Sequence, residues 1–293
     1  MLEAEAIAPD GASHVVVIIP GSGPIDRDGN SGHSRLLTNT YKLLAEDLAQ
    51  RGIASLRIDK RGFYGSAAAI EDPNDVTVAA YATDARAWVT KAADFAPCVW
   101  IAGHSEGGLV ALLAAQQEPD RLCGLILMAT SGRPTGRLLL EQFEANPANA
   151  PFMQEVESII DSLENQKAVD IDEVSPVLRG IFAPGLQRYM MELFSHDPIA
   201  LAGNWRGPTL IIQGDADLQV RPHDADLLEK ALPFSRRMDL KGGTHMLKTD
   251  VAGQPFATYA DPSLPLHEAV IDSIVDFISD ETILRPGASR HGD

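Results

Sequence analysis

Short apolar runs rich in β-branched residues alternate with segments of helical periodicity along the first 130 residues of the chain. The runs have the length of strands, and turns that contain glycine follow several of them. We expect strands at His14–Ile19, Ile53–Ile58, Val99–Gly103 and Leu125–Ala129. We expect helices at Leu36–Arg51, Val78–Ala93 and Ser105–Gln117. Because parallel strands need crossover connections, this alternation predicts an α/β fold with a mostly parallel central sheet flanked by helices on both faces.

The alternation is interrupted between residues 131 and 204, where no strong buried strand is present. Apolar residues recur there at helical spacing, in the pieces Leu138–Glu144, Phe152–Leu163, Val177–Phe182 and Leu186–Phe194. Further strands are expected at Thr209–Gln213 and Arg236–Leu240, and further helices at His223–Ala231 and His267–Ile278. We therefore predict one α/β core from residues 1–130 and 205–293 and a helical insertion at 131–204. The polar tail at 285–293 is predicted to be disordered.

The composition indicates a globular protein and argues against two classes of partner. Apolar residues make up 45% of the chain, which is enough to bury a sizeable core. The formal net charge of −17 repels phosphate backbones and anionic lipid headgroups. We therefore expect neither nucleic acid nor a membrane surface as a partner, while the oligomeric state is left open.

The two cysteines, Cys98 and Cys123, each stand beside an expected core strand, and we expect buried free thiols rather than a disulfide. No cluster of Cys and His has the spacing of metal ligands, so no metal site is expected. The N-terminus lacks the basic start and apolar run of a signal peptide. No apolar stretch approaches the ~20 residues that a membrane span needs. These features predict a cytoplasmic location.

The pattern Gly103-His104-Ser105-Glu106-Gly107 lies between an expected strand and an expected helix. G-x-S-x-G alone is short, and a surface serine in a glycine-containing turn is the alternative interpretation. A buried strand before the pattern and a helix after it are the context that a nucleophilic serine requires. Glycines at both ends allow a turn tight enough to expose the hydroxyl, and the N-terminal amides of the helix favour negative charge beside it. We therefore predict that Ser105 is a nucleophile.

A serine nucleophile needs a base, usually a histidine oriented by a carboxylate, and in such folds both follow the serine in the chain. The later histidines are His196, His223, His245, His267 and His291. We predict His245 as the base, because its loop GGTHMLK follows the last expected strand and can carry an imidazole over the serine. For the acid, Asp215 and Asp217 both follow the strand Thr209–Gln213, and their spacing does not choose between them.

These stretches together resemble the α/β-hydrolase superfamily, in particular its microbial serine esterases and serine-aminopeptidase-like hydrolases. The matching stretches are PGSGPIDRDGNS at 20–31, LAEDLAQRGIASLRIDKRGFYGS at 44–66, GHSEGG at 103–108, QGDADLQV at 213–220 and GGTHMLK at 242–248. The resemblance implies the α/β-hydrolase fold, with the insertion as a helical cap over the active site. In that family the acid usually occupies the last position of G-x-x-D, which selects Asp217 over Asp215, and the family histidine matches His245.

The resemblance also implies an oxyanion hole made of two backbone N–H groups. One belongs to Glu106, directly after the nucleophile, and the other to Ser22, with Gly23 as second choice. Pro20 stands where many lipases have histidine, a departure similar to esterases that carry G-S-G-P. We expect the Glu106 side chain to point away from the oxyanion.

Acidic and basic residues follow directly after this loop, and we expect them to stabilise its structure. We expect Asp26, Arg27 and Asp28 to form an ion-pair cluster that fixes the oxyanion loop, with Lys60 or Arg61 as partner. A role in substrate binding is the alternative.

The function implied is that of a carboxylesterase-like serine hydrolase, which cleaves small-molecule esters through an acyl-enzyme and needs no metal or organic cofactor. Because a cap implies a closed pocket, short to medium acyl chains are expected. A thioesterase, an amidase or aminopeptidase, and a carbon–carbon bond hydrolase are alternatives with the same triad. A non-catalytic ligand-binding protein on this scaffold is the rival from another class, disfavoured because Ser105, Asp217 and His245 are all present.

Overall fold

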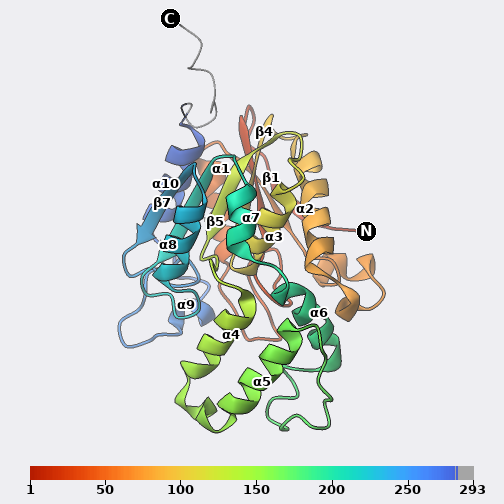
Figure 1. The fold of residues 1–293 in the computed structure, drawn as a ribbon. Coiled ribbons are helices and arrows are strands. Elements are labelled where there is room, and N and C mark those ends of the chain that lie inside the picture. The colour runs from red at the N-terminus through yellow and green to blue at the C-terminus, as the bar shows by residue number, and fades with distance from the viewer. Residues whose placement is uncertain (281, 283–293) are drawn as a thin grey trace, which may run out of the picture.

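The computed structural model describes residues 1–280 and 282, which contain a seven-stranded sheet (Figure 1). The strands are β1 (Ala4–Ile7), β2 (His14–Ile19), β3 (Ala54–Ile58), β4 (Cys98–His104), β5 (Leu122–Met128), β6 (Thr209–Gly214) and β7 (Ser235–Leu240). Their order across the sheet is β1-β3-β2-β4-β5-β6-β7. β1 is antiparallel to β3, and all other neighbouring strands are parallel. The expected mostly parallel sheet is confirmed.

Helices occupy most of the connections between the strands. They are α1 (Thr40–Gln50), α2 (Val78–Ala92), α3 (Glu106–Ala115), α4 (Thr135–Glu144), α5 (Met153–Glu164), α6 (Pro184–Phe194), α7 (Pro198–Asn204), α8 (Pro222–Ala231), α9 (Ala257–Ala260) and α10 (Ala269–Ile278). Short 3-10 helices are η1 (Tyr64–Ala69), η2 (Pro73–Asp75) and η3 (Pro147–Phe152). Within the described residues, no helix is both long and apolar enough to cross a membrane.

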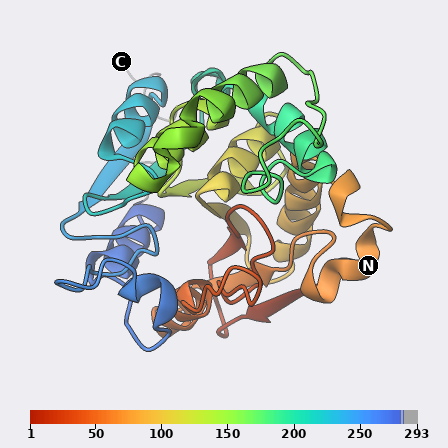
Figure 2. The same ribbon diagram turned by 90° about the horizontal axis from the view of Figure 1, so that it is seen from below.

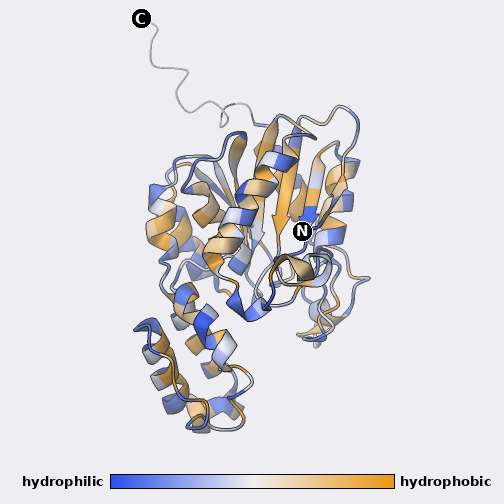
Figure 3. Cartoon of the chain, turned by 90° about the vertical axis from the view of Figure 1, so that its right-hand side faces the viewer, coloured by the Kyte–Doolittle hydropathy of each residue, from blue (hydrophilic) through white to orange (hydrophobic). Residues whose placement is uncertain are grey.

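The sheet is covered on both faces, and β2 shows why. Successive side chains of a strand point to opposite faces, so Val15 and Val17 join the core beneath α2 and α3, whereas Val16 and Ile18 join the core beneath α1 and α10. All four side chains are buried. The hydrophobic colouring of the central strands in Figure 3 shows the result, an apolar sheet between two layers of helices.

The chain between β5 and β6 carries α4 to α7. Figure 1 shows α4, α5 and α6 beyond one end of the sheet. Side chains of α4 and α6 line a pocket together with the turn that follows β4, so these helices lie over the carboxyl ends of the strands. Seen from below, the green helices of the insertion face the orange-red loop that follows β2 (Figure 2). α7 instead packs beside the sheet against α3 and α8.

The structure differs from several predicted elements. α1 begins at Thr40 rather than Leu36, because Leu36 pairs with Ser31 in an isolated bridge. Residues 177–182 form turns and not a helix, since prolines on both sides leave too few residues for one. β1 was not expected, because it has only four residues, Glu5 among them, and lacks a continuous apolar run. The tail predicted at 285–293 lies outside the described residues.

The expectation of free thiols is wrong, because Cys98 and Cys123 form a disulfide with their Cα atoms 5.6 Å apart. The two residues belong to neighbouring parallel strands, β4 and β5. The pairing of these strands shifts between Val99 and Trp100, which places Cys123 at an irregularity beside the start of β4. Twenty-five positions separate the cysteines in the chain, so only the strand pairing brings them together.

Candidate active site

Ser105 occupies the turn between β4 and α3 with a backbone φ of 54° and ψ of −121°. A residue other than glycine rarely adopts positive φ, and the surrounding structure must hold it there. A Cβ atom at Gly103 would lie 2.2 Å from the carbonyl oxygen of Gly107. A Cβ atom at Gly107 would lie 2.4 Å from the carbonyl oxygen of Ile19. Only glycine fits at either position, and the tight turn that results presents the Ser105 side chain to a pocket.

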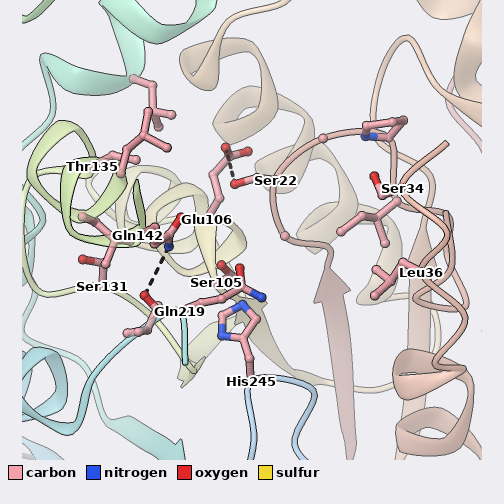
Figure 4. A pocket seen from close by; sticks show the side chains of 18 of the residues that line it. Ser22, Ser34, Leu36, Ser105, Glu106, Ser131, Thr135, Gln142, Gln219 and His245 are labelled. Carbon is pink, nitrogen blue, oxygen red and sulfur yellow. Dashed lines mark hydrogen bonds between the residues drawn. The ribbon is translucent and has the colours of Figure 1, made fainter. Parts of the chain in front are cut away.

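His245 lies in the loop after β7, and its Nδ1 donates a hydrogen bond of 2.8 Å to Oδ2 of Asp217. Asp217 is held in turn by the backbone N–H groups of Gln219 at 2.7 Å and Val220 at 3.0 Å. Burial acts to raise the pKa of Asp217, but the charge and hydrogen bond of His245, together with the two backbone hydrogen bonds, keep the pKa below its usual value. His245 and Ser105 line the same pocket and lie side by side in Figure 4.

Asp215 is separated from this histidine. Its Oδ1 accepts a hydrogen bond of 2.5 Å from the backbone N–H of Gly242, so it joins the turn after β6 to the turn after β7. The other candidate histidines also lie elsewhere. His196 contacts Glu192, His223 contacts Asp226, and His267 contacts the backbone of Lys241. His291 lies outside the described residues.

The two expected oxyanion donors, Ser22 and Glu106, line the pocket beside Ser105. Glu106 is the first residue of α3, so its N–H has no partner within the helix. In the described part of the chain, neither this N–H nor that of Ser22 donates a hydrogen bond to a protein atom. Both groups are therefore available to a bound oxyanion.

The side chain of Glu106 lines the pocket and is held there by neighbouring side chains. Its Oε2 accepts a hydrogen bond of 2.9 Å from the Ser22 hydroxyl, drawn in Figure 4. Its Oε1 accepts one of 2.7 Å from the Tyr189 hydroxyl and lies 3.6 Å from Lys60 Nζ. The carboxylate is thus held by two hydroxyl donors and balanced by one buried ammonium group.

Residue 104, which precedes the serine, has a structural role that the sequence reasoning missed. His104 Nε2 donates to the carbonyl oxygen of His245 at 2.7 Å, so Nδ1 of the neutral ring accepts from the Tyr41 hydroxyl at 2.8 Å. The same hydroxyl accepts from the backbone N–H of Gly21 at 3.1 Å. Burial and the nearby His245 lower the pKa of His104 to about 3, so the ring stays neutral. A single buried chain of hydrogen bonds therefore joins the loop after β2 to the His245 loop.

Of the expected ion-pair cluster, Arg27 and Asp28 form ion pairs, with other partners than the two predicted. Asp26 instead accepts hydrogen bonds from the backbone N–H groups of Asp28 and Asn30. Arg27 donates to Asp59 through Nε at 2.9 Å, and Asp28 pairs with Arg57. Asp59 is buried, so the pair ties the loop after β2 to the end of β3. The cluster supports the loop and lies outside the pocket lining.

A pocket of about 1650 Å³ lies over Ser105 and His245. Its lining is mainly apolar on the side of the insertion. The apolar side chains there include Leu138, Leu139, Leu186, Met190 and Leu193. Throughout residues 1–280 and 282, no group of three or more His, Cys, Asp or Glu side chains is placed to hold a metal ion.

The fold and part of the sequence match known proteins. The structure is similar to that of Est1E from Butyrivibrio proteoclasticus with ferulic acid bound, with a TM-score of 0.60 and 21% identity over 94% of this chain and 95% of that chain. It is also similar to the esterase EaEST from Exiguobacterium antarcticum, with a TM-score of 0.58 and 16% identity over 94% of this chain and 95% of that chain. At such identities these likenesses show the fold alone.

A third solved structure, the malate-bound thermophilic esterase from Thermogutta terrifontis, has a TM-score of 0.58 and 19% identity over 94% of this chain and 92% of that chain. A comparison with curated proteins found no match. The family described as serine aminopeptidase S33 matches residues 36–251, well over half of the chain. The chain therefore belongs to the serine aminopeptidase S33 family and has the α/β-hydrolase fold.

Proposed function

We propose that the protein is a carboxylesterase-like serine hydrolase with Ser105, His245 and Asp217 as its catalytic triad. The observation that carries this proposal is the 2.8 Å hydrogen bond between His245 and Asp217 beside a serine held at positive φ in the same pocket. A buried carboxylate at Nδ1 leaves Nε2 as the nitrogen that accepts a proton from the serine. Membership of a serine hydrolase family supports the same reaction class.

In the proposed mechanism, Ser105 attacks the ester carbonyl carbon while His245 Nε2 takes the hydroxyl proton. The negative charge that develops on the carbonyl oxygen is stabilised by the backbone N–H groups of Ser22 and Glu106. His245 then gives its proton to the departing alcohol, which leaves an acyl-enzyme. A water molecule, deprotonated by His245, releases the acid and restores the serine. Asp217 keeps the imidazole in the required orientation and stabilises its charged form.

We propose that α4 and α6 act as a cap that shapes the substrate pocket. The pocket of about 1650 Å³ exceeds the ~300–1,000 Å³ that is common for small-molecule sites. Its apolar side chains on α4 and α6 suit a bulky apolar group of the ester, so we propose such substrates in place of the short to medium acyl chains expected from the sequence. A panel of p-nitrophenyl esters of increasing acyl size tests this, and a maximum at acetyl would contradict it.

The central test of the proposed function is Ser105→Ala. The variant should fold like the wild type and lose hydrolysis of all p-nitrophenyl esters, and a fluorophosphonate should label the wild type but not the variant. Ester, thioester and amide substrates with the same acyl group should be compared, because their leaving groups separate the reactions that share this triad. Near wild-type turnover by Ser105→Ala would refute the triad, and a folded wild type that resists labelling would favour a ligand-binding protein.

The partner that we propose is a small-molecule ester, with neither nucleic acid nor a membrane. The cytoplasmic location expected from the sequence stays a prediction. The Cys98–Cys123 disulfide weighs against it, because disulfides are rare in reducing compartments.

A further inference from the structure

The Glu106 carboxylate joins three segments that are far apart in the sequence. Ser22 belongs to the loop after β2, Lys60 follows β3, and Tyr189 lies on α6 of the insertion. All three contact this one carboxylate, and Glu106 is also the residue whose N–H is proposed to bind the oxyanion. The side chains of the two proposed oxyanion donors are therefore hydrogen-bonded to each other.

Lys60 holds the same loop from its other side. Its Nζ donates to the carbonyl oxygen of Gly21 at 2.5 Å, and its side chain is almost fully buried. Burial lowers the pKa of Lys60, whereas the charge of Glu106 acts to raise it. Because each charge of a buried pair needs the other, the ammonium group anchors the carboxylate in this position. Gly21 and Ser22 are thus fixed by consecutive contacts.

Tyr189 brings α6 into this arrangement. Burial, followed by the charge of Glu106, raises the pKa of Tyr189 well above its usual value, so the hydroxyl stays protonated and keeps donating. One turn further along α6, Glu192 accepts from the backbone N–H groups of Val78 and Ala79, at the start of α2. α6 is therefore seated on the core at α2 and on the nucleophile turn at Glu106.

We propose that Glu106 and Tyr189 are positioning residues that align the oxyanion loop only while α6 is seated over the pocket. The inference rests on the proposed function, because it concerns the same oxyanion hole. The Ser22 hydroxyl has Glu106 as its partner, so displacement of the carboxylate removes the side-chain contact that fixes Ser22 and its N–H, although Gly21 is still held by Lys60 and Tyr41. Closure of the insertion over a substrate is in this way coupled to the completion of the oxyanion hole.

A variant that disturbs the contact between Glu106 and Tyr189 should lose kcat with little change in KM. Removal of one complete oxyanion donor costs ~10²–10³ in kcat, so misalignment of a donor that is still present should cost about 10-fold. The ground-state ester depends less on the oxyanion hole than the transition state does, so KM should stay within about threefold. Inactivation by a fluorophosphonate should slow in parallel, since it also places negative charge in the hole.

The test compares Tyr189→Phe, Glu106→Gln and their double variant on one p-nitrophenyl ester. Each single variant should lose about 10-fold in kcat, and the double variant should lose no more than the worse single one, because both disturb one contact. The matched control is Arg188→Gln, which breaks an exposed ion pair between α6 and Asp75 and should keep wild-type kcat. Ser22→Ala removes the hydroxyl with little change in packing and should reproduce the loss if a variant at 106 or 189 fails to fold.

Two results would overturn the coupling. One is a kcat of Tyr189→Phe equal to that of Arg188→Gln. The other is a loss of kcat in the double variant equal to the product of the losses in Tyr189→Phe and Glu106→Gln. Ser105→Ala is measured in parallel. If it keeps turnover, the proposed function itself fails. If it is inactive while Tyr189→Phe and Ser22→Ala behave as wild type, only the coupling fails.

Discussion

His245 Nδ1 lies 2.8 Å from a carboxylate oxygen of Asp217, whereas the carboxylate of Asp215, two residues earlier, accepts from the backbone N–H of Gly242. Two aspartates of one turn thus have separate roles. One faces the imidazole, and the other holds the turn against the loop that carries the imidazole.

Replacement of these aspartates should therefore give unequal results. Asp217→Asn keeps the shape of the side chain but favours the wrong tautomer of His245, which should lower kcat by ~10⁴, as in other serine triads. Asp215→Asn is the matched control and should retain most of the activity. Steady-state kinetics on one p-nitrophenyl ester measures both, and a larger loss for Asp215→Asn would show that the acid is misassigned.

The turn around Ser105 should not tolerate a side chain at Gly107. Gly107→Ala forces a Cβ atom against the carbonyl oxygen of Ile19, and such overpacking costs typically 1–3 kcal/mol. We expect a less stable protein with little turnover. Gly203→Ala is the control, because a Cβ atom there meets no atom within 4 Å and alanine favours helix α7 by about 0.5–1 kcal/mol. Urea unfolding measures the change in the free energy of unfolding, which should be negative for Gly107→Ala and positive for Gly203→Ala. Equal free energies of unfolding for the two variants would contradict the predicted clash at Gly107.

Stability should fall as the pH drops below about 6.5, in part because of His104. Burial lowers its pKa to about 3 in the folded protein, whereas the unfolded chain binds a proton near the ordinary value of 6.5. Between these values the unfolded state holds one more proton, so the free energy of unfolding decreases with falling pH by ~1.4 kcal/mol per unit from this residue.

In His104→Gln the free energy of unfolding should fall less steeply with decreasing pH, by ~1.4 kcal/mol per pH unit, because the proton taken up by His104 on unfolding is lost. This difference in slope does not depend on the absolute stability of the variant. Urea unfolding between pH 6 and pH 4.5 measures the slope. His33→Gln, at an exposed position, should leave it unchanged. Identical slopes in the wild type and His104→Gln would mean that the folded protein protonates His104 over this range.

The disulfide between Cys98 and Cys123 should stabilise the protein by constraining the unfolded chain. For a loop of 25 residues the expected contribution is about 3.5 kcal/mol, which the double variant Cys98→Ala, Cys123→Ala should lose. Dithiothreitol should lower the unfolding midpoint of the wild type but not that of the double variant. A wild type indifferent to the reductant, with two titratable thiols after unfolding, would show that the cysteines are free.

Much of the fold could be predicted because its signals are local. The strands β2, β4 and β6 contain apolar runs, as strands buried on both faces usually do, and their bounds lie close to the predicted ones. The bounds of β3 also lie close to the predicted ones, although it contains Ser55 and Arg57. The edge strand β1 escaped prediction because it has only four residues and one of them is the exposed Glu5. The GHSEG turn was predictable as well, since a tight turn of this kind leaves no space for a Cβ atom at Gly103 or Gly107.

Contacts across the sheet edge could not be read from the chain. Asp215 and Asp217 are equivalent by spacing. The family resemblance favours Asp217, and the return of the His245 loop beside β6 places the imidazole against it. The cysteine pairing depends on the irregular register of β4 and β5. Distances between segments tens of residues apart are a property of packing, which no local pattern encodes.

For Glu106, the sequence determines the position of the residue, and the tertiary structure determines the direction of its side chain. Its position after Ser105 follows from the residues alone, because a strand, a tight glycine turn and a helix force that backbone path. The direction of its carboxylate follows from Ser22, Lys60 and Tyr189, which three separate segments bring to it. Backbone geometry is set by short-range sterics, whereas the partner of a buried charge is set by whatever the completed fold places within hydrogen-bonding distance.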